Sequence, residues 1–371
     1  MRKQTLCAIA GAAAISLTLA GCGGGDDSAS SSPSGSAAAG SGGSVGVILP
    51  DSSTSPRWEA NDRPLLAASF EEAGIDADIQ NANGDTATFG TICDGMINAG
   101  VDVLLIVNLD SESGTACLKK AQAAGIQTID YDRLTLGGGA SYYVSFDNVK
   151  VGNLMGEGLA TCLTDAGKTD ASIVYINGDP TDNNAALFKE GYVEALKPKI
   201  DGGTYKLVGD QTGEWDATKA GTAFEQLYTQ NNGAIDGVVS ANDTMAGGII
   251  ARLKANGLNG KVPVTGQDAS VAGLQAILVG DQCMTVYKAI QKEADAASAL
   301  AISLINGDDG SDLATGTVTD TVLNTEVPSV LETPEAIFKA DVKSVIDDGF
   351  QTVADVCTPE YAAACAAAGI S

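Results

Sequence analysis

The sequence predicts an α/β fold of two doubly wound lobes, each built on a parallel sheet. From Ser44 onward, short β-rich runs alternate with longer amphipathic stretches. The β-rich runs, such as residues 103–107, are apolar throughout instead of alternating with polar residues, which is typical of strands covered on both faces. This repetition is too long for one sheet, and the roughly 330 residues involved are enough for two lobes of ordinary size.

The expected elements fall into two series. The first has strands at 45–49, 76–80, 103–107 and 127–130 and helices at 58–73, 86–99 and 115–124. The second has a helix at 149–164, strands at 173–176, 206–208, 238–241, 264–266 and 284–287, and a long Ala-rich helix that ends near residue 304. Polar residues follow many of these strands, and in open α/β sheets the ligand crevice lies beyond the carboxyl ends of the strands.

The N-terminus has the layout of a secretory signal. Arg2 and Lys3 precede a mostly apolar run over 5–20, and Leu19-Ala20-Gly21-Cys22 is the pattern cleaved before a cysteine that receives a lipid. We therefore expect a lipoprotein signal over 1–21, lipidation of Cys22 and a Gly/Ser-rich tether over 22–43. The protein is therefore expected to be exported. Its only contact with the membrane would be the lipid, on the outer face of the cytoplasmic membrane. An ordinary secreted protein with a coincidental cysteine is the alternative.

Charge and composition exclude several classes of function. The chain has 47 acidic and 21 basic residues, a formal net charge of −26, so nucleic acids and anionic lipid surfaces would repel it. It contains no histidine, which removes the commonest general base, the Ser-His-Asp and Cys-His mechanisms and the commonest zinc ligand. We expect a monomer without catalytic residues, cofactor or metal ion.

Six cysteines remain beyond the signal and the lipidation site, and an even number in an exported protein indicates disulfides. Fifteen pairings are formally possible. Proximity in the expected fold favours Cys93 with Cys117 on neighbouring helices and Cys357 with Cys365 in the tail. Cys162 with Cys283 is then the pair left over.

Nine short segments, in one order along 46–350, resemble the type I periplasmic sugar-binding proteins of ABC transporters, and most closely their D-xylose-binding subgroup. The segments are Arg57-Trp58, Ala82-Asn83-Gly84, Tyr131-Asp132-Arg133, Ser145-Phe146-Asp147-Asn148, Asp182-Asn183-Asn184-Ala185, Val208-Gly209-Asp210-Gln211, Ala241-Asn242-Asp243, Gly266-Gln267-Asp268-Ala269 and Thr285-Val286-Tyr287-Lys288.

The resemblance implies two lobes joined by three chain crossings, which we place near 146–148, 287–288 and 327–331. The N-terminal lobe is then 44–146 plus 288–328, and the C-terminal lobe is 147–287 plus 329–371. A sugar bound between them would be held by hydrogen bonds from charged and amide groups, with flat aromatic rings on its C–H faces. The residues implied as sugar ligands are Arg57, Trp58, Arg133, Asp182, Asn183, Asn184, Trp215, Asn242, Asp268 and Lys288.

Each of these residues also has a simpler interpretation. The arginines could form salt bridges on an acidic protein, the tryptophans could pack in a core, Asp182 could cap a helix, and Lys288 could be exposed. The loops at 52–56 and 212–214 depart from the family pattern, so Trp215 could be displaced. The tail from 356 to 371 has no counterpart in that pattern, and it could staple the last helix to its lobe.

The function implied by the resemblance is capture of a monosaccharide, D-xylose or a related sugar, and its delivery to an ABC transporter permease. The alternative is a binding protein for another pentose, a hexose or a small signal molecule. A sugar-responsive repressor shares this fold but needs a basic DNA-binding headpiece, where this chain has a signal and a tether. A glycosidase using Asp182 and Asp268 is a third possibility, which the spacing alone does not distinguish from binding. A fourth possibility is that the sugar-bound protein serves a chemoreceptor, which would be a different protein partner for the same ligand.

Overall fold

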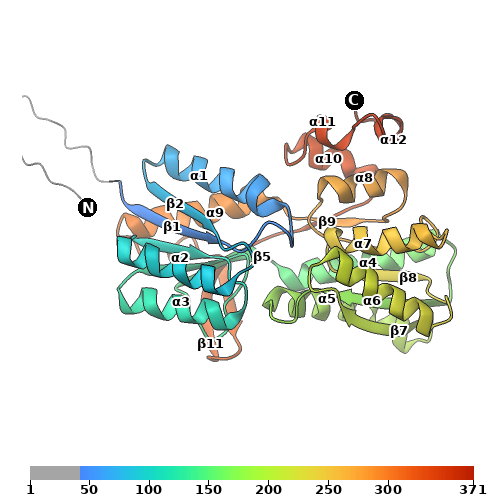
Figure 1. Ribbon diagram of the computed structural model, residues 1–371, viewed down its shortest axis with the longest axis horizontal. Helices are drawn as coiled ribbons and strands as arrows, with labels where there is room; N and C mark the ends of the chain where they lie inside the picture. The colour runs from blue at the N-terminus through green and yellow to red at the C-terminus, as the bar shows by residue number, and fades with distance from the viewer. Residues whose placement is uncertain (1–41) are drawn as a thin grey trace, which may run out of the picture. The chain divides into compact units, whose positions relative to one another are not determined.

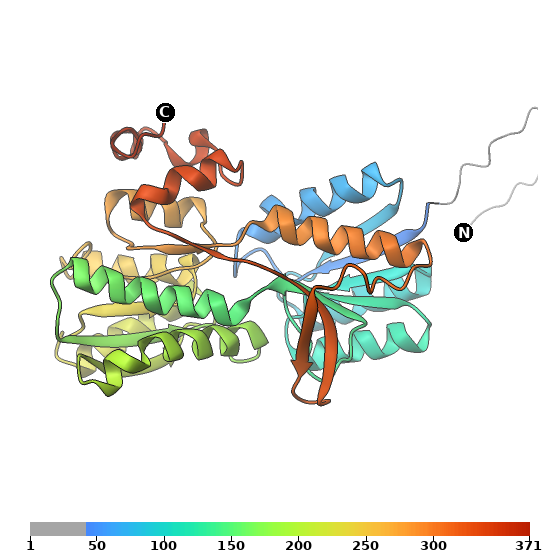
Figure 2. The same ribbon diagram turned by 180° about the vertical axis from the view of Figure 1, so that it is seen from behind.

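The computed structural model describes residues 42–371, which form two lobes joined by chain crossings (Figures 1 and 2). The predicted signal over 1–21, Cys22 and most of the tether over 22–43 lie outside the described residues. Among the helices of the described part, none is long and apolar enough to cross a membrane.

The first lobe contains a seven-stranded sheet in the order β10-β11-β5-β4-β3-β1-β2. All neighbouring strands are parallel except β10 and β11, which form an antiparallel hairpin. The strands are β1 (Ser44–Leu49), β2 (Asp76–Asn81), β3 (Val103–Ile106), β4 (Gln127–Tyr131), β5 (Tyr142–Phe146), β10 (Gly316–Asp320) and β11 (Thr325–Glu332).

Helices cover both faces of this sheet, as the apolar strands predict. They are the short π-helical turn η1 (Trp58–Asp62) and the α-helices α1 (Arg63–Glu72), α2 (Thr86–Ala99), α3 (Ser111–Ala123) and α9 (Ile290–Ile305). Val47 and Leu49 of β1 pack in one core cluster with α1 and α9. Ile48 points to the opposite face and packs in a second cluster with α2 and α3.

The second lobe contains a three-stranded parallel sheet in the order β7-β6-β8, extended by a bridge between Val238 and Val264. Its strands are β6 (Ala171–Asn177), β7 (Tyr205–Thr212) and β8 (Gly237–Ser240). Its helices are α4 (Asn148–Asp165), α5 (Asn183–Asp201), α6 (Ala217–Gln230), α7 (Asp243–Ala255) and α8 (Val271–Val279). Helices α4 and α5 cross so closely that a Cβ at Gly152 would lie 2.0 Å from the Phe188 carbonyl oxygen.

One expected strand does not join the parallel sheet. The sequence predicts that residues 284–287 continue the second series, but β9 (Thr285–Tyr287) instead pairs antiparallel with β12 (Glu335–Ile337). The reason is that the chain returns from the first lobe after β11 and runs beside β9 in the opposite direction (Figure 2). The apolar sequence of β9 shows that it is buried, but it does not specify its partner.

The third crossing also differs from the prediction, which places it at 327–331 and begins the last piece of the C-terminal lobe at 329. Residues Ser329–Glu332 pair with β5 in the first sheet, so the chain leaves that sheet only after Glu332. The other two crossings join β5 to α4 and β9 to α9.

The C-terminal tail packs on the outside of α8. Its elements are η2 (Lys339–Asp341), α10 (Val342–Asp347), α11 (Val353–Val356) and α12 (Ala362–Ala367). Val356, Cys365 and Ile370 share a core cluster with Leu274 and Ile277 of α8. The tail therefore covers an apolar helix face that would otherwise meet water.

The structure confirms all three favoured disulfides. Cys93 is bonded to Cys117, Cys162 to Cys283 and Cys357 to Cys365, with Cα atoms 5.9, 6.3 and 5.9 Å apart. The first two join α2 to α3 and α4 to the segment before β9, so each fixes elements of one lobe.

Removing the Cys162–Cys283 bond should destabilise the protein more than removing the Cys357–Cys365 bond. The two bonds close chain segments of 121 and 8 residues, and loop-closure entropy gives about 5 kcal/mol for the longer loop and about 2.5 kcal/mol for the shorter. Urea unfolding of the two double alanine variants measures the difference. Equal losses would show that chain entropy is not the main contribution.

Candidate functional site

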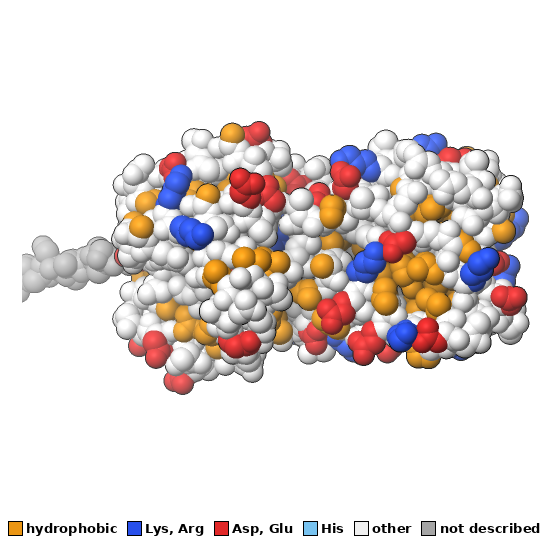
Figure 3. Space-filling view, turned by 90° about the horizontal axis from the view of Figure 1, so that it is seen from below, with side chains coloured by type: hydrophobic (Ala, Val, Ile, Leu, Met, Phe, Trp, Pro, Cys, Tyr) orange, Lys and Arg blue, Asp and Glu red, His pale blue; other side chains and the backbone are white. Residues whose placement is uncertain are grey.

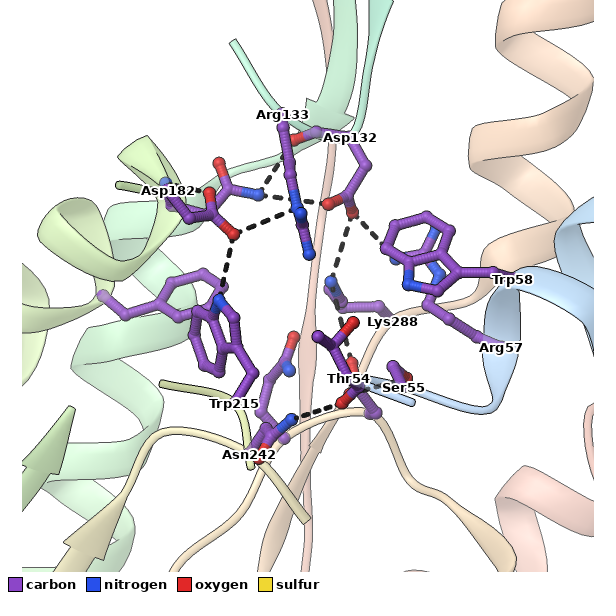
Figure 4. A pocket seen from close by; sticks show the side chains of 14 residues that line it. Thr54, Ser55, Arg57, Trp58, Asp132, Arg133, Asp182, Trp215, Asn242 and Lys288 are labelled. Carbon is purple, nitrogen blue, oxygen red and sulfur yellow. Dashed lines mark hydrogen bonds and ion pairs between the residues drawn. The ribbon is translucent and has the colours of Figure 1, made fainter. Parts of the chain in front are cut away.

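Side chains from both lobes and from one crossing meet in a buried pocket (Figure 4). The residues that line it are Thr54, Ser55, Arg57, Trp58, Asp132, Arg133, Asp182, Asn184, Phe188, Trp215, Asn242, Gln267, Asp268 and Lys288. Most follow the carboxyl ends of strands, where the fold places ligand crevices. The space left between the side chains is small, about 30 Å³ for the centres of water molecules.

Arg57 is held in place by three acidic side chains of its own lobe. Its guanidinium donates to Asp62 at 2.6 and 2.9 Å, to Asp132 at 2.8 Å and to Glu293 at 2.6 Å. It also lies 4.4 Å from the centroid of the Trp58 ring, a cation–π contact. The salt-bridge interpretation of Arg57 is therefore correct, and the same side chain also lines the pocket.

Two helix caps supply polar groups to the pocket. One carboxylate oxygen of Asp182 accepts from the backbone N–H of Asn184 at the start of α5, and the other accepts from Trp215 Nε1 at 3.2 Å. Asn242 caps α7 by accepting from the N–H of Met245, and its Nδ2 donates to the Thr54 carbonyl. Asp182 and Asn242 each cap a helix and also line the pocket, because each side chain has a second polar atom.

Trp215 lies in the pocket although the loop before it departs from the family pattern. Its ring packs edge-on against Phe188, with centroids 6.2 Å apart. A Cβ at Gly178 would fall 2.0 Å from the ring, so the absence of a side chain there makes room for it. Trp58 and Trp215 lie on opposite sides of the pocket, with Lys288 between them (Figure 4).

Direct polar contacts across the pocket hold the two lobes together. Arg133 Nε of the first lobe lies 3.0 Å from Asp182 Oδ2 of the second. Asn184 Nδ2 donates to Asp132 Oδ1 at 3.1 Å. Ser55 Oγ donates to Asp268 at 3.1 Å. These contacts define a closed arrangement, and a polyhydroxylated ligand would replace several of them with its own hydroxyls.

Lys288 is buried, so its interpretation as an exposed lysine is wrong. It follows β9 at a crossing, is 3% exposed, and places Nζ 3.4 Å from Asp132 and 3.8 Å from Asp268. Burial by itself would raise the pKa of Asp132. The neighbouring cations Lys288, Arg57 and Arg133 outweigh burial and hold this pKa well below its usual range. Burial raises the pKa of Asp182 and of Asp268.

Three pocket residues have left-handed backbone angles that side chains rarely adopt. The φ angles are +61° at Asp132, +58° at Trp215 and +108° at Asp268. Such conformations cost about 1–3 kcal/mol each and persist where the surroundings fix them, often at functional sites. Here they turn the side chains at the ends of strands into the pocket.

Two buried polar atoms of the pocket have no hydrogen-bond partner among the described residues, Trp58 Nε1 and Gln267 Oε1. Leaving such a group unpaired costs about 1–3 kcal/mol. One is a donor and the other an acceptor, and a hydroxyl group can satisfy either kind. The pocket therefore suits a ligand that carries several hydroxyl groups.

Nine of the ten residues predicted as sugar ligands line the pocket, and Asn183 does not. Asn183 is the first residue of α5, and its neighbour Asn184 lines the pocket instead. Their role in binding stays a prediction. Five further residues line the pocket that were not predicted from the sequence, namely Thr54, Ser55, Asp132, Phe188 and Gln267.

The signals for these missed residues differ in strength. Asp132 and Gln267 lie inside recognised segments, directly before Arg133 and Asp268, and could have been included. Phe188 follows Asn184 by one helical turn, a spacing that places both on one face of α5. Thr54 and Ser55 lie in a loop that departs from the family pattern and gave no signal. In the described part of the chain, no group of three or more His, Cys, Asp and Glu residues is placed to hold a metal ion.

Two lobes with a polar pocket between them have the geometry of a two-lobed binding protein. A family model described as a periplasmic binding protein domain matches residues 45–309. The D-xylose-binding periplasmic protein of Escherichia coli (strain K12) is 39% identical over 299 residues, which cover 79% of this chain and 87% of that protein. The multiple sugar-binding periplasmic receptor ChvE of Rhizobium radiobacter is 32% identical over 332 residues, covering 84% and 92%.

A solved structure gives the same classification. The carbohydrate transporter solute binding protein from Chloroflexus aurantiacus, in complex with D-glucose, has a TM-score of 0.77 at 28% identity, covering 84% of this chain and 97% of that one. The chain belongs to the periplasmic binding protein family. Proteins of this family are exported, in agreement with the predicted export of this chain.

The free energy of unfolding should fall as the pH rises from about 5 to about 8. Burial raises the pKa of Glu293 from 4.5 to about 8, so over this range the folded protein keeps a proton that the unfolded chain releases. Each such proton lowers the stability by about 1.4 kcal/mol per pH unit. Glu293→Gln resembles the protonated acid and should flatten the dependence.

Urea unfolding at several pH values between 5 and 8 measures the slope. Part of the slope should remain in Glu293→Gln, because burial also raises the pKa of Asp130 and of Asp243 to about 7. Glu157→Gln, at an exposed position of α4, is the control and should keep the full slope. An identical slope in wild type and Glu293→Gln would contradict the assignment.

Proposed function

We propose that this protein is the solute-binding component of a sugar ABC transporter, that its ligand is a monosaccharide, and that the ligand is D-xylose. The observation that carries the proposal is the pocket itself. Trp58 and Trp215 lie on opposite sides, and charged and amide side chains of both lobes lie between them. Aromatic rings suit the C–H faces of a sugar ring, and the polar groups suit its hydroxyls. The similarity to D-xylose-binding periplasmic proteins supports this choice of sugar.

The proposed mechanism is closure of the lobes around the sugar. Arg57 is already positioned by its own lobe, whereas the contacts of Arg133 with Asp182 and of Ser55 with Asp268 form only when the lobes meet. A sugar that interacts with both lobes favours the closed form by its difference in affinity between the two forms. We propose that the permease recognises that closed form.

Binding without catalysis is part of the proposal. The named relatives are binding proteins, and the carboxylate of Asp182 is already engaged as a helix cap and as the partner of Arg133. Detectable hydrolysis of a xyloside would overturn this part. Nucleic acid is also a poor partner, because the formal net charge of the chain is −26. On the face shown in Figure 3, the basic side chains lie apart from one another among acidic ones.

Isothermal titration calorimetry of residues 44–371 with D-xylose, D-glucose, D-ribose and L-arabinose tests the ligand. The protein is first unfolded and refolded to remove retained sugar. We expect one-to-one binding that is tightest for D-xylose. Tighter binding of another sugar would keep the proposed class and replace the ligand, and no heat with any of them would contradict sugar binding.

Asn184 and Asn183 provide a matched pair for the same assay. Asn184→Ala removes an amide that lines the pocket. Leaving its ligand partner unsatisfied costs about 1–3 kcal/mol, which corresponds to a roughly 5-fold to 150-fold weaker affinity. Asn183→Ala changes the neighbouring residue, which does not line the pocket, and should leave the affinity unchanged. Equal effects would show that the position of these side chains is misassigned.

We further propose that a lipid on Cys22 anchors the protein to the membrane. The support is the sequence Leu19-Ala20-Gly21-Cys22 followed by a Gly/Ser-rich stretch. In cells, Cys22→Ser should move the protein from the membrane fraction to the soluble fraction, and immunoblotting of the two fractions measures this. A variant that stays in the membrane fraction would exclude the anchor.

A further inference from the structure

We propose that a second subsite adjoins the sugar pocket and accepts a neutral substituent attached to the bound sugar, such as the second ring of a disaccharide or an alkyl or aryl group. The inference rests on the proposed sugar binding and extends it to glycosides. It comes from a second and larger cavity between the lobes, with a volume of about 740 Å³. Small-molecule sites commonly have volumes of about 300–1,000 Å³.

The larger cavity has walls from three parts of the chain. The first lobe contributes residues of the loop after β1 and of η1, and the second lobe contributes the first turns of α7 and α8, the loop between α10 and α11, and a residue of α11. The lining residues include Ser55, Arg57, Asn61, Gly247, Asp268 and Phe350.

The two cavities share part of their lining. Ser55, Arg57 and Asp268 line both, so their side chains form the partition. Arg57 is fixed by its three acidic partners. The part of the wall that can open is therefore the single hydrogen bond of 3.1 Å from Ser55 Oγ to Asp268 Oδ2. A sugar hydroxyl bound at Asp268 would point toward the larger cavity, and a group attached to that oxygen would enter it.

The lining of the larger cavity selects a neutral substituent. Asp268 and Asp355 contribute acidic side chains, and the only cation among the lining residues, Arg57, is already paired, so an anionic group would find no free cation there. Phe350, which packs on Tyr287 with centroids 5.1 Å apart, offers a fixed aromatic wall. Amide side chains such as Asn61 offer hydrogen bonds. This mixture suits a second sugar ring or an aglycone.

Gly247 of α7 allows the cavity to be filled without disturbing the monosaccharide pocket. A Cβ at Gly247 would meet nothing within 4 Å, and the residue is exposed and does not line the sugar pocket. Gly247→Phe therefore places a ring in the larger cavity. Gly95→Phe in α2 is the matched control, because Gly95 is also a helical, exposed glycine with open space at its Cβ.

Calorimetric titration of wild type with D-xylose, xylobiose, D-glucose and cellobiose tests the inference. We expect at least one disaccharide to bind with an affinity within about tenfold of its monosaccharide. Gly247→Phe should weaken that disaccharide at least about tenfold and leave the monosaccharide unchanged, while Gly95→Phe should change neither.

The outcomes separate the two proposals. If neither monosaccharide binds, the proposed function fails, and this inference fails with it. If a monosaccharide binds and its disaccharide does not, the proposed function stands and the second subsite is overturned. If a disaccharide binds equally well to wild type and Gly247→Phe, its second ring lies elsewhere, and the subsite is likewise overturned.

Discussion

The arrangement between the lobes depends on the cost of burying charge. Arg57, Arg133 and Lys288 are each at most 7% exposed, and an unpaired charge in such surroundings is strongly unfavourable. Every one of them therefore needs a carboxylate nearby, and Asp132, Asp182 and Asp268 are placed accordingly. The positions of these carboxylates in turn depend on tight turns at the ends of strands.

The buried charges fall into a permanent set and an exchangeable set. Arg57 pairs with Asp62 and Asp132 and donates a hydrogen bond to Glu293, all on elements of the first lobe, so these contacts do not depend on the second lobe. Arg133 pairs with Asp182 across the pocket, and this pair requires both lobes. A ligand that competes for the exchangeable set finds the permanent set already oriented, which lowers the entropy lost on binding.

The protein uses ordinary structural devices as parts of its site. Asp182 and Asn242 cap helices with one polar atom and present the other to the pocket. Capping fixes the rotamer, so the second atom is held in place at little additional cost. Lys288 likewise has two roles. It lies in a chain crossing, and its cation lies between two aspartates of different lobes.

The sequence by itself determined the features that depend on local chemistry. Continuous apolar runs specified strands buried on both faces, the position of Asp182 before a helix indicated a cap, and an even set of cysteines specified disulfides. The tertiary structure decided the features that depend on residues far apart in the chain. It paired β9 with β12, kept β11 in the first sheet as far as Glu332, and brought Asn184 into the pocket while leaving Asn183 outside it. Ser55 and Asp268, which meet across the pocket, are 213 residues apart, and no local pattern records which side chain a given group will meet.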